Sequence, residues 1–519
     1  MPDRPSPASD PPACYGAGRV PVLTAEEMRE WDRRAVEELG VPQPVLMEAA
    51  GRAAAAVVQR LYPRGRVACA VGSGNNGGDA LVLARTLRAG GREVAVVAVG
   101  SRAPDAALLH GWEVETIPAD GAAAAFRAAE VIVDGLLGTG ASGPPRDACA
   151  RAIEAINGAG KKVVALDGPS GVDFTTGAAA GAAVRADVTV TFGAPKRGLL
   201  LFPGRRLCGR IVAVEIGFAP FDPDCGAQLL TPAWAQARLP AVPPDAHKGQ
   251  RGRVVVVAGR RGMAGAAVLA GMGALRAGAG MAVLVGPEAN RGILQAALPE
   301  ALFADRDALD DGVLRAADAV VAGPGMGTDD ESLALLRRVA AAAECPLLFD
   351  ADAITLLARD PSLRDAVAGP LLLTPHPGEM SRLLGVKTEE IRRDPFAAAA
   401  QAAERYCCAV LLKGAPSLVA GAGEPTLVNV TGHAGIATGG MGDVLGGMIG
   451  AFLAVAIAPR TAAGLGLYYS GRAAQLAGRG RGLLPRDVVE ALPAAMLEEA
   501  PAESDLGVPG VILDLPPAY

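Results

Sequence analysis

The sequence is poor in aromatic residues and has no excess of positive charge. Phe, Trp and Tyr make up 4% of its 519 residues, whereas Ala and Gly are abundant. This composition favours small-residue helices packed closely on sheets over a β-sandwich. The formal net charge is −6. Nucleic-acid-binding domains are usually basic, so we do not expect a nucleic acid as a partner.

Cysteine pairs at metal-binding or redox spacing and long apolar runs are also lacking. The eight cysteines form no CxxC motif, and several lie in apolar stretches, as Cys69 does in VACAV. They are typical of reduced cytosolic thiols. The most apolar run, Val444 to Ala458, is too short to span a bilayer and contains three glycines. We expect it to form a buried helix in a cytoplasmic protein with no membrane segment.

The length predicts two large domains. Strand–loop–helix patterns recur in both halves, and a Pro-rich stretch from Pro220 to Asp245 separates them. The Pro-rich start of the chain lacks the apolar core of a signal peptide, so we expect a disordered tail there. The expected parts are a tail at 1–18, an α/β domain at 19–220, a linker at 221–245, a second α/β domain at 246–498 and a C-terminal tail at 499–519.

The N-terminal half contains a predicted βαβ unit with a glycine-rich first loop. A buried strand at 67–71 leads into the loop 72–79, and a helix at 80–89 and a strand at 94–99 follow. The loop satisfies GxGxxG, which alone is a weak sign of dinucleotide binding. The acid expected at the end of the next strand is absent. A Rossmann oxidoreductase is therefore an alternative that the sequence does not favour.

Polar residues follow three predicted strands of this half. Asn75, Asn76 and Asp79 lie in the first loop, Asp134 follows the strand at 131–133, and Ser170 lies just after the strand at 163–166. Strand ends of a doubly wound sheet meet at one edge, so Asn76, Asp134 and Ser170 are expected to converge. Such oxygens and amides suit a polar ring or an oxygen-loving cation. The alternative is that they are turn formers and helix caps.

The segments NNGGD, VDGLLGTG and LDGPSGVD, preceded by LTAEEMREWDRRAVEELG, resemble the epimerase domain of the NAD(P)H-hydrate repair enzymes over residues 19–220. The resemblance implies that the hydrated cofactor binds to Asn75, Asn76, Gly77, Gly78, Asp79, Gly138, Thr139, Gly140, Ala141, Ser142, Gly143, Pro144 and Asp167. It also implies a potassium ion held by Asn76, Asp134 and Ser170. Ala80 departs from the family pattern, which usually has Gly there, and Ala49 often has an amide counterpart.

The C-terminal half repeats the strand-then-loop pattern. Strands are predicted at 254–258, 282–285, 319–321, 347–349, 371–374 and 410–412, with helical stretches between them, so a second α/β domain is expected. Of the four histidines, His247, His376 and His433 lie in Gly/Pro-rich loops, which suggests a polar pocket. They do not form a zinc set, because the i, i+4 spacing and cysteine partners are missing.

A glycine-dense loop, Thr438 to Asp443, runs directly into the apolar helix-length run. Glycines let backbone N–H groups turn toward one point, and a helix start adds the positive end of its dipole. Such a loop suits a phosphate whose charge grows during transfer. Asp443 is placed where a carboxylate could take a proton from a substrate hydroxyl. The alternative is that Asp443 is an ordinary helix N-cap.

Lys413 ends a predicted strand before Gly-Ala-Pro-Ser, where its charge and the backbone donors can meet a nucleotide phosphate. There is no GxxxxGK[ST] motif, so a Walker-type NTPase is excluded. KGAPS with a late GGMGD resembles the ribokinase-like superfamily. Within it, HKGQRG, GMAGAA, GPGMGT, TPHPGE and KGAPS in this order resemble the ADP/ATP-dependent NAD(P)H-hydrate dehydratases over residues 245–495.

This second resemblance implies two sets of contacts. The hydrated cofactor would contact Ala264, Gly327, His376 and Asp443. The adenine nucleotide would contact Lys413, Gly414, Ala415, Pro416, Ser417 and Gly442. The chain has Met441 where the family usually has Thr or Ser, and His433-Ala434 where it usually has Asn-Pro.

Together the resemblances imply an α/β protein with an N-terminal Rossmann-like doubly wound sheet and a C-terminal ribokinase-like domain. It would epimerise R and S NADHX and NADPHX and dehydrate the S form to NAD(P)H at the expense of ADP or ATP. K⁺ is the implied cofactor of the epimerase and Mg²⁺ that of the dehydratase, and we expect a homo-oligomer. The alternative is a ribokinase-like vitamin-alcohol kinase fused to a Rossmann-like ligand-binding module.

Overall fold

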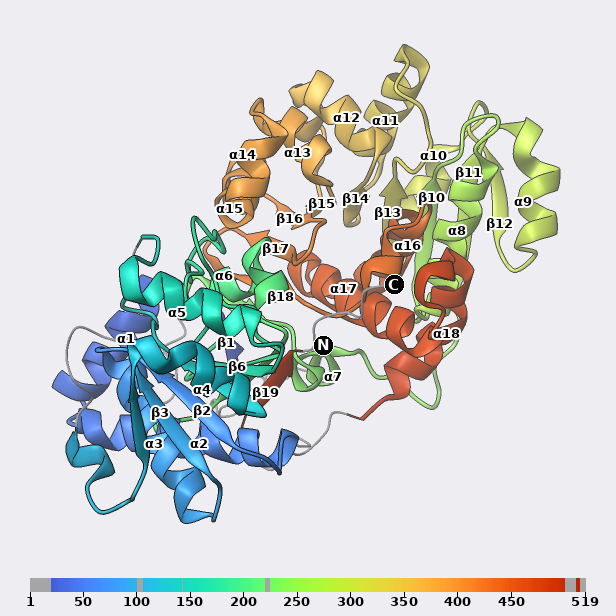
Figure 1. The fold of residues 1–519 in the computed structure, drawn as a ribbon. Helices are drawn as coiled ribbons and strands as arrows, with labels where there is room; N and C mark the ends of the chain where they lie inside the picture. The colour runs from blue at the N-terminus through green and yellow to red at the C-terminus, as the bar shows by residue number, and fades with distance from the viewer. Residues whose placement is uncertain (1–19, 100–105, 142, 220–224, 500–509, 514–519) are drawn as a thin grey trace. The chain divides into compact units, whose positions relative to one another are not determined.

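The computed structural model describes residues 20–99, 106–141, 143–219, 225–499 and 510–513. The described residues form two units by their internal contacts, one within 20–228 together with 510–513 and the other within 229–499 (Figure 1). The tail expected at 1–18 and the predicted site residue Ser142 lie outside the described residues. Each unit is built on its own largely parallel sheet, so the predicted α/β fold class is confirmed.

The sheet of the first unit has the strand order β19-β8-β7-β6-β5-β2-β3-β4. The strands are β2 (Val67–Val71), β3 (Val94–Ala98), β4 (Glu115–Pro118), β5 (Val131–Gly135), β6 (Lys162–Leu166), β7 (Val188–Phe192), β8 (Arg210–Val214) and β19 (Gly510–Leu513). All pairs are parallel except β19 with β8. The chain order reverses between β2 and β5, and ligands of doubly wound sheets bind at such a reversal.

Helices cover both faces of this sheet. Along β2, Cys69 and Val71 pack with α2 (Gln43–Leu61) and α3 (Asn75–Ala89). Ala68 and Ala70 face the other way, into a core with α4 (Ala122–Ala128) and α5 (Asp147–Gly158). Alternating residues of a strand point to opposite faces, so one short apolar strand contributes to two cores.

Helix α3 begins at Asn75, five residues before the start that the sequence predicted at Ala80. Glycine is a poor helix former, and the glycines of NNGGD therefore read as loop. Tertiary packing decides otherwise, because a β carbon on Gly77 would overlap the backbone oxygen of Gly72. The polar residues of the motif thus lie on the first turns of a helix.

Helix α1 (Ala25–Glu37) starts with a capping box. The amide of Glu27 donates to Thr24 Oγ1 at 3.1 Å, and the amide of Thr24 donates to Glu27 Oε2 at 2.7 Å. The preceding residue, Leu23, pairs with the backbone beside Lys196. This pairing holds α1 next to the loop that follows β7.

The sheet of the second unit contains the order β18-β17-β16-β15-β14-β13-β10-β11-β12. The strands are β10 (Arg253–Val257), β11 (Met281–Gly286), β12 (Leu302–Asp305), β13 (Ala319–Ala322), β14 (Leu347–Phe349), β15 (Leu371–Leu373), β16 (Ala409–Leu412), β17 (Ser417–Gly421) and β18 (Glu424–Asn429). Strands β10 to β16 pair in parallel, and β17 and β18 are antiparallel additions.

The apolar run that the sequence predicted as a buried helix forms α16 (Met441–Ala454). It packs against α8 (Ala264–Arg276), and both lie in the main core of this unit. A β carbon on Gly447 would overlap the backbone oxygen of Ala270, and one on Gly273 would overlap that of Val444. The two helix backbones touch, which fixes where α16 begins. None of the described helices is long and apolar enough to cross a bilayer.

Two stretches carry elements that the sequence analysis did not expect. Within the expected linker 221–245, Thr231 caps α7 (Pro232–Arg238), and Trp234 is 2% exposed because it packs against α17 (Pro459–Ala477) at Gly464. Within the expected tail 499–519, β19 pairs with β8. Both elements depend on contacts with residues far away in the sequence, so local patterns did not reveal them.

Two candidate active sites at the strand ends

The structure brings together Asn76, Asp134 and Ser170, the three residues predicted to hold potassium. Asp134 is fully buried and accepts hydrogen bonds from the amide of Ser170 at 2.8 Å and from its hydroxyl at 2.7 Å. Asn76 Nδ2 donates to the backbone oxygens of Leu137 at 2.9 Å and Leu166 at 3.1 Å. Ser170 Oγ accepts from the amide of the same Leu137 at 2.9 Å. The site lies at the C-terminal ends of β2 and β5, the two neighbouring strands between which the chain order reverses.

These oxygens have the chemistry of a cation site. The Oδ1 atom of Asn76 is buried and has no hydrogen-bond partner in the part of the chain that the structure describes. Burial raises the pKa of Asp134 to about 6, although its bonds from Ser170 and Leu136 oppose the rise. An unsatisfied buried acceptor beside a buried carboxylate is costly, and a bound cation would satisfy both. The donor set fits potassium.

Asp167 holds the neighbouring loop, which contains Gly138 and Thr139, by hydrogen bonds. Its Oδ2 atom accepts from the amide of Thr139 at 2.7 Å and from the hydroxyl of Thr139 at 2.5 Å. Its Oδ1 atom lies 2.5 Å from Lys196 Nζ. Burial would raise the pKa of Asp167, but Lys196 and Thr139 outweigh burial and hold that pKa below its usual range. A β carbon on Gly138 would lie 3.0 Å from Asp167 Oδ2, so this loop passes close to the carboxylate.

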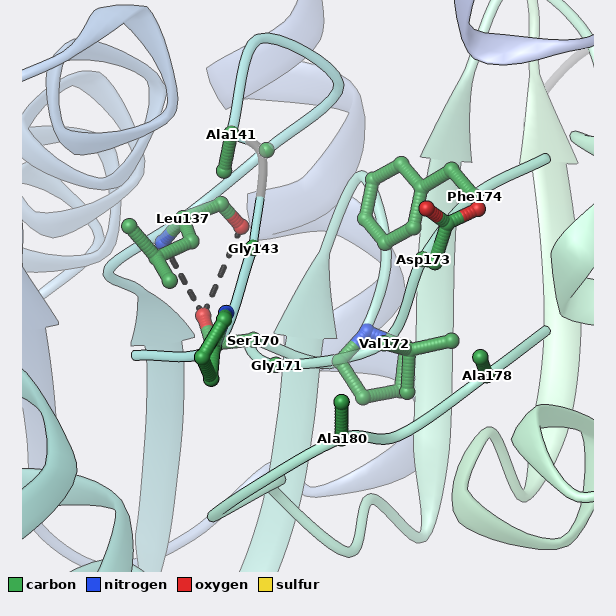
Figure 2. Close-up of a pocket in the computed structure, with 13 residues that line it drawn as sticks. Leu137, Ala141, Gly143, Ser170, Gly171, Val172, Asp173, Phe174, Ala178 and Ala180 are labelled. Atoms are coloured by element: carbon green, nitrogen blue, oxygen red, sulfur yellow. Dashed lines mark hydrogen bonds between the residues drawn. The ribbon is translucent and has the colours of Figure 1, made fainter. Parts of the chain in front are cut away.

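A cavity of about 110 Å³ opens beside this loop (Figure 2). Five predicted cofactor-binding or potassium residues line it, namely Gly138, Ala141, Gly143, Pro144 and Ser170. Figure 2 also shows Asp173 and Phe174 on the opposite wall, which the sequence analysis did not select. Asp173 is the last residue of the segment LDGPSGVD and Phe174 follows it directly, so their position at the end of that segment was the available signal. Of the other predicted residues, Asn75 and Gly140 are exposed.

Sequence reasoning missed two further charged residues of this unit. Lys196 follows β7 and is fully buried, and Asp32 lies on α1. Burial raises the pKa of Asp32 to about 6, and Asp167 adds to the rise while Lys196 opposes it. Burial first, and then the charges of Asp167 and Asp32, raise the pKa of Asp79 well above its usual range. The only sequence signal for Lys196 was its position after another strand of the same sheet.

In the second unit, the glycine loop starts α16 as the sequence suggested, but Asp443 is not its cap. The N-cap is Gly440, whose φ of +91° suits glycine, and Asp443 is the third residue of the helix. The alternative of an ordinary Asp N-cap is therefore wrong. Gly440 brings no side chain to the first turn; the amide of Met441 donates to Thr438 O at 3.3 Å, and the amides of Gly442 and Asp443 have no partner among the described residues and can meet a ligand.

An ion pair lies directly against this first turn. Lys413 Nζ is 2.5 Å from Asp350 Oδ1, and Thr374 Oγ1 donates to the same oxygen at 2.8 Å. A β carbon on Gly442 would lie 3.2 Å from Lys413 Nζ. Burial raises the pKa of Asp443 to about 7; Asp350 adds to this rise and Lys413 opposes it. Asp350 ends a predicted strand but was not selected, because its partner is remote in sequence.

His376 joins this charged group through Glu379. His376 is the N-cap of α13 (Pro377–Leu384), its backbone amide donates to Glu379 Oε2 at 2.8 Å, and its Nε2 is 3.3 Å from Glu379 Oε1. Burial raises the pKa of Glu379, and the charge of Asp350 contributes, whereas the bond from His376 and the charge of Lys413 lower it. His247 and His433, predicted to share a polar pocket with His376, each accept a hydrogen bond within their own loops.

The remaining predicted cofactor contacts lie on two loops that hydrogen-bond to each other. The amide of Gly259 donates to Pro324 O at 2.9 Å, and that of Arg260 donates to Gly325 O at 2.6 Å. Ala264, the first residue of α8, follows one loop, and Gly327 lies in the other. The KGAPS segment forms the turn between β16 and β17, in which the amide of Gly414 donates to Ser417 Oγ at 3.1 Å.

Comparisons with known proteins match both units. A family described as NAD(P)H-hydrate dehydratase matches residues 254–494, and one described as YjeF-related protein N-terminus matches residues 43–198. A curated protein of Moorella thermoacetica, named bifunctional NAD(P)H-hydrate repair enzyme Nnr, is 36% identical over 92% of this chain and 97% of its own. The protein of that name from Escherichia coli is 37% identical over 91% of this chain and 93% of its own. This chain belongs to the bifunctional NAD(P)H-hydrate repair enzymes.

Solved structures that are similar to part of this chain include two proteins. The ADP/ATP-dependent NAD(P)H-hydrate dehydratase from Bacillus subtilis, co-crystallised with ATP/Mg²⁺, is 31% identical over 51% of this chain and 96% of its own, with a TM-score of 0.47. A ribokinase-like superfamily protein from Enterococcus faecalis is 29% identical over 53% of this chain and 97% of its own, with a TM-score of 0.49. The family predicted from the sequence motifs is confirmed.

Proposed function

We propose that the chain repairs hydrated NADH and NADPH in two steps. The second unit dehydrates the S epimer to NAD(P)H at the expense of ADP or ATP, and the first unit interconverts the R and S epimers so that both are consumed. The observation that carries the proposal is the position of Asp443, which lies in the first turn of α16 beside the Asp350–Lys413 pair. Membership of the repair-enzyme family supports it.

Dehydration must remove a hydroxyl from the ring, and hydroxide is a poor leaving group. Asp443 takes the proton of this hydroxyl, whose oxygen then attacks the terminal phosphoryl group of the nucleotide. The N–H groups at the start of α16 stabilise the charge that develops on that group. The phosphate then leaves with the electrons of its C–O bond, the neighbouring carbon loses a proton to water, and the electrons of that C–H bond restore the double bond of the dihydronicotinamide. Ala264, Gly327 and His376 are proposed to hold the hydrated cofactor in place.

The nucleotide is proposed to lie along KGAPS, between Lys413 and Ser417, with Gly442 near its phosphates. Lys413 Nζ faces both Asp350 and Gly442, so its charge is directed at the place where the phosphoryl group would move. The nucleotide would bind as its Mg²⁺ complex, and the ion would neutralise part of the negative charge of the phosphates.

In the first unit, the hydrated cofactor is proposed to bind along NNGGD and the loop Gly138–Pro144. Asp167, which is hydrogen-bonded to that loop, is proposed to contact the cofactor as well. A potassium ion would be held by Asn76, Asp134 and Ser170, where the buried Oδ1 of Asn76 has no hydrogen-bond partner among the described residues. When bound, the ion would supply a fixed positive charge beside the ring. We assign the epimerase to residues 19–220 and the dehydratase to residues 246–498. A homo-oligomer and a cytoplasmic location remain predictions from the sequence.

The test follows the near-UV absorbance of the dihydronicotinamide. Hydrated NADH, as a mixture of epimers, is incubated with the full-length protein, Mg²⁺ and either ADP or ATP. We expect the band to return only with nucleotide, and the nucleotide that works names the phosphate donor. Recovery beyond the share of one epimer, faster than spontaneous epimerisation, would demonstrate the epimerase. No return with either nucleotide would refute the dehydratase and leave the vitamin-alcohol kinase to be tested.

A further inference from the structure

Three carboxylates at the proposed epimerase site feel the charge of a single lysine, Lys196, which contacts one of them directly. Asp32 lies on α1, Asp79 on α3 and Asp167 directly after β6, and each of them lies close enough to Lys196 for its charge to act on them. One ammonium group cannot balance the charges of three carboxylates, so at least one of them is favoured in its neutral form. The contacts of each group decide which one that is.

Lys196 and Asp167 form a fixed pair with no spare bonding capacity on the lysine. Besides Asp167, Lys196 Nζ donates to Thr191 Oγ1 and to the backbone oxygen of Phe192, both at 2.9 Å. All three of its N–H donors are thus used inside the protein. Both oxygens of Asp167 are also engaged, one by Lys196 and the other by Thr139. This pair is suited to position the loop and not to exchange a proton with a ligand.

Asp79 has the opposite surroundings. It is 9% exposed, and no described residue hydrogen-bonds to its carboxyl group. Asp79 lies three residues after Asn76, on the same face of α3, and Asn76 reaches the ends of β5 and β6 through Leu137 and Leu166. The carboxyl group of Asp79 therefore belongs to the strand-end crevice in which the hydrated ring is proposed to bind.

The other charged groups packed around α3 are already paired. Glu48 on α2 forms an ion pair with Arg85 on α3, and Asp134 on β5 is bonded by Ser170. Burial together with the charges of Asp167 and Asp32 raises the pKa of Asp79 far above its usual range, and Lys196 opposes this only in part. These surroundings favour the protonated form of Asp79, whereas Lys196 and Thr139 favour the carboxylate form of Asp167.

We propose that Asp79 is the general acid and base of the epimerase, and that Asp32, Asp167 and Lys196 are positioning residues that keep its proton in place. This inference rests on the epimerase function proposed above. It assigns the proton transfer to one carboxyl group and separates that group from the ion pair next to it. Asp32 lies outside residues 43–198, so it belongs to the part of the chain that the N-terminal family match does not include.

The proposed reaction balances without an oxidant or a reductant. The hydrated cofactor is the product of adding water to an enamine, and its hydroxyl is on the carbon that is bonded to the ring nitrogen. Asp79 gives its proton to this hydroxyl, the C–O bond breaks, and water leaves with the bonding electrons while the nitrogen lone pair forms a C=N bond. Water then adds to the other face of the planar carbon, the C=N electrons return to nitrogen, and the released proton returns to Asp79. The carboxylate of Asp79 stabilises the cation between these steps.

The first experiment compares wild type, Asp79→Asn and Asp120→Asn as full-length proteins. Asp120 is an exposed carboxylate of the same unit and serves as the matched control. Epimerisation is followed by chromatographic separation of the R and S forms, the dehydratase activity of the same preparation reports on folding of the second unit, and circular dichroism compares the folding of the variants with that of wild type. We expect Asp79→Asn to lose at least about 100-fold in kcat while KM changes little, because general acid–base groups contribute that much. Epimerisation by Asp79→Asn within a few-fold of wild type would overturn the inference.

The second experiment uses Asp32→Asn and does not depend on the folding of the first variant. The reaction starts from protonated Asp79, so kcat falls as pH rises through the pKa of Asp79. Loss of the negative charge of Asp32 lowers that pKa, and the falling limb is expected to move to lower pH. A lower plateau with an unmoved limb would mean that Asp32 is only structural and would overturn its role. If wild type itself does not epimerise, the proposed function fails instead.

Discussion

Lys413 and Asp350 form a largely buried ion pair that lies against the glycines of α16. The side chain of Asp350 is 2% exposed, and its Oδ1 is 2.5 Å from Lys413 Nζ. A β carbon on Gly442 would lie 3.7 Å from Asp350 Oδ2. Two opposite charges thus act on the neighbouring carboxyl group of Asp443, and the dehydratase should respond when either is altered.

The dehydratase is expected to lose activity in mild acid. Burial raises the pKa of Asp443 to about 7, and a general base works only as the carboxylate. The rate should therefore fall as pH falls through about 7 and should level off above it. Asp443→Asn should reduce dehydration by at least about 100-fold, with epimerisation unchanged. Stopped assays of both activities across pH check this, and dehydration by Asp443→Asn at the wild-type rate would refute the assignment.

Asp350→Asn is expected to move the acidic limb of that profile to lower pH. The negative charge of Asp350 raises the pKa of Asp443, so its removal lets Asp443 lose its proton more easily. Lys413→Met should move the limb in the opposite direction, because Lys413 holds the same pKa down. The pH dependence of kcat/KM for the three proteins decides between them. Limbs that coincide would show that the pair does not act on the base.

Ser170→Ala is expected to raise the potassium concentration that the epimerase needs. The hydroxyl of Ser170 donates to Asp134 at 2.7 Å and accepts from the amide of Leu137 at 2.9 Å. Its loss therefore removes one proposed potassium ligand and a hydrogen bond to another, Asp134. Thr176→Ala, which removes an exposed hydroxyl of the same unit, is the matched control. Epimerisation is titrated with KCl at constant ionic strength. An unchanged half-activating concentration in Ser170→Ala would argue against the site.

Gly447→Ala is expected to destabilise the second unit by about 1–3 kcal/mol, the usual cost of overpacking a tight contact. Its β carbon would overlap the backbone oxygen of Ala270 and push α16 away from α8. Gly292→Ala is the control, because no atom lies within 4 Å of the new β carbon and Gly292 is exposed in α9 (Arg291–Ala297). That change should be neutral or stabilising by up to about 1 kcal/mol. Urea unfolding of both variants measures the difference.

Local patterns in the sequence predicted many of the helices and strands correctly. Runs of apolar residues predicted β2 and α16. These signals act over a few residues, so they can be read directly. The glycines of NNGGD misled the prediction of α3, because their close contact with Gly72 is tertiary and overrides helix propensity.

The charged partners within the sites could not be read in the same way. Asp167 and Lys196 are 29 residues apart, and Asp350 and Lys413 are 63 residues apart. No pattern within a short window marks either pair, and only the packing of separate strand ends brings them together. Asn76, Asp134 and Ser170 were predicted to converge because each follows a strand of one parallel sheet. Topology was therefore a better guide to position than to bonding partners.

The pairing of β19 with β8 means that the first catalytic half is not encoded in one continuous piece. A fragment that ended in the 221–245 stretch would leave the N–H and C=O groups of β8, from Arg210 to Val214, as an open sheet edge. Open edges invite pairing with other chains. Anyone who wishes to study the epimerase by itself should therefore graft the strand Gly510–Leu513 back onto it, since a single cut in the gene does not separate the two halves.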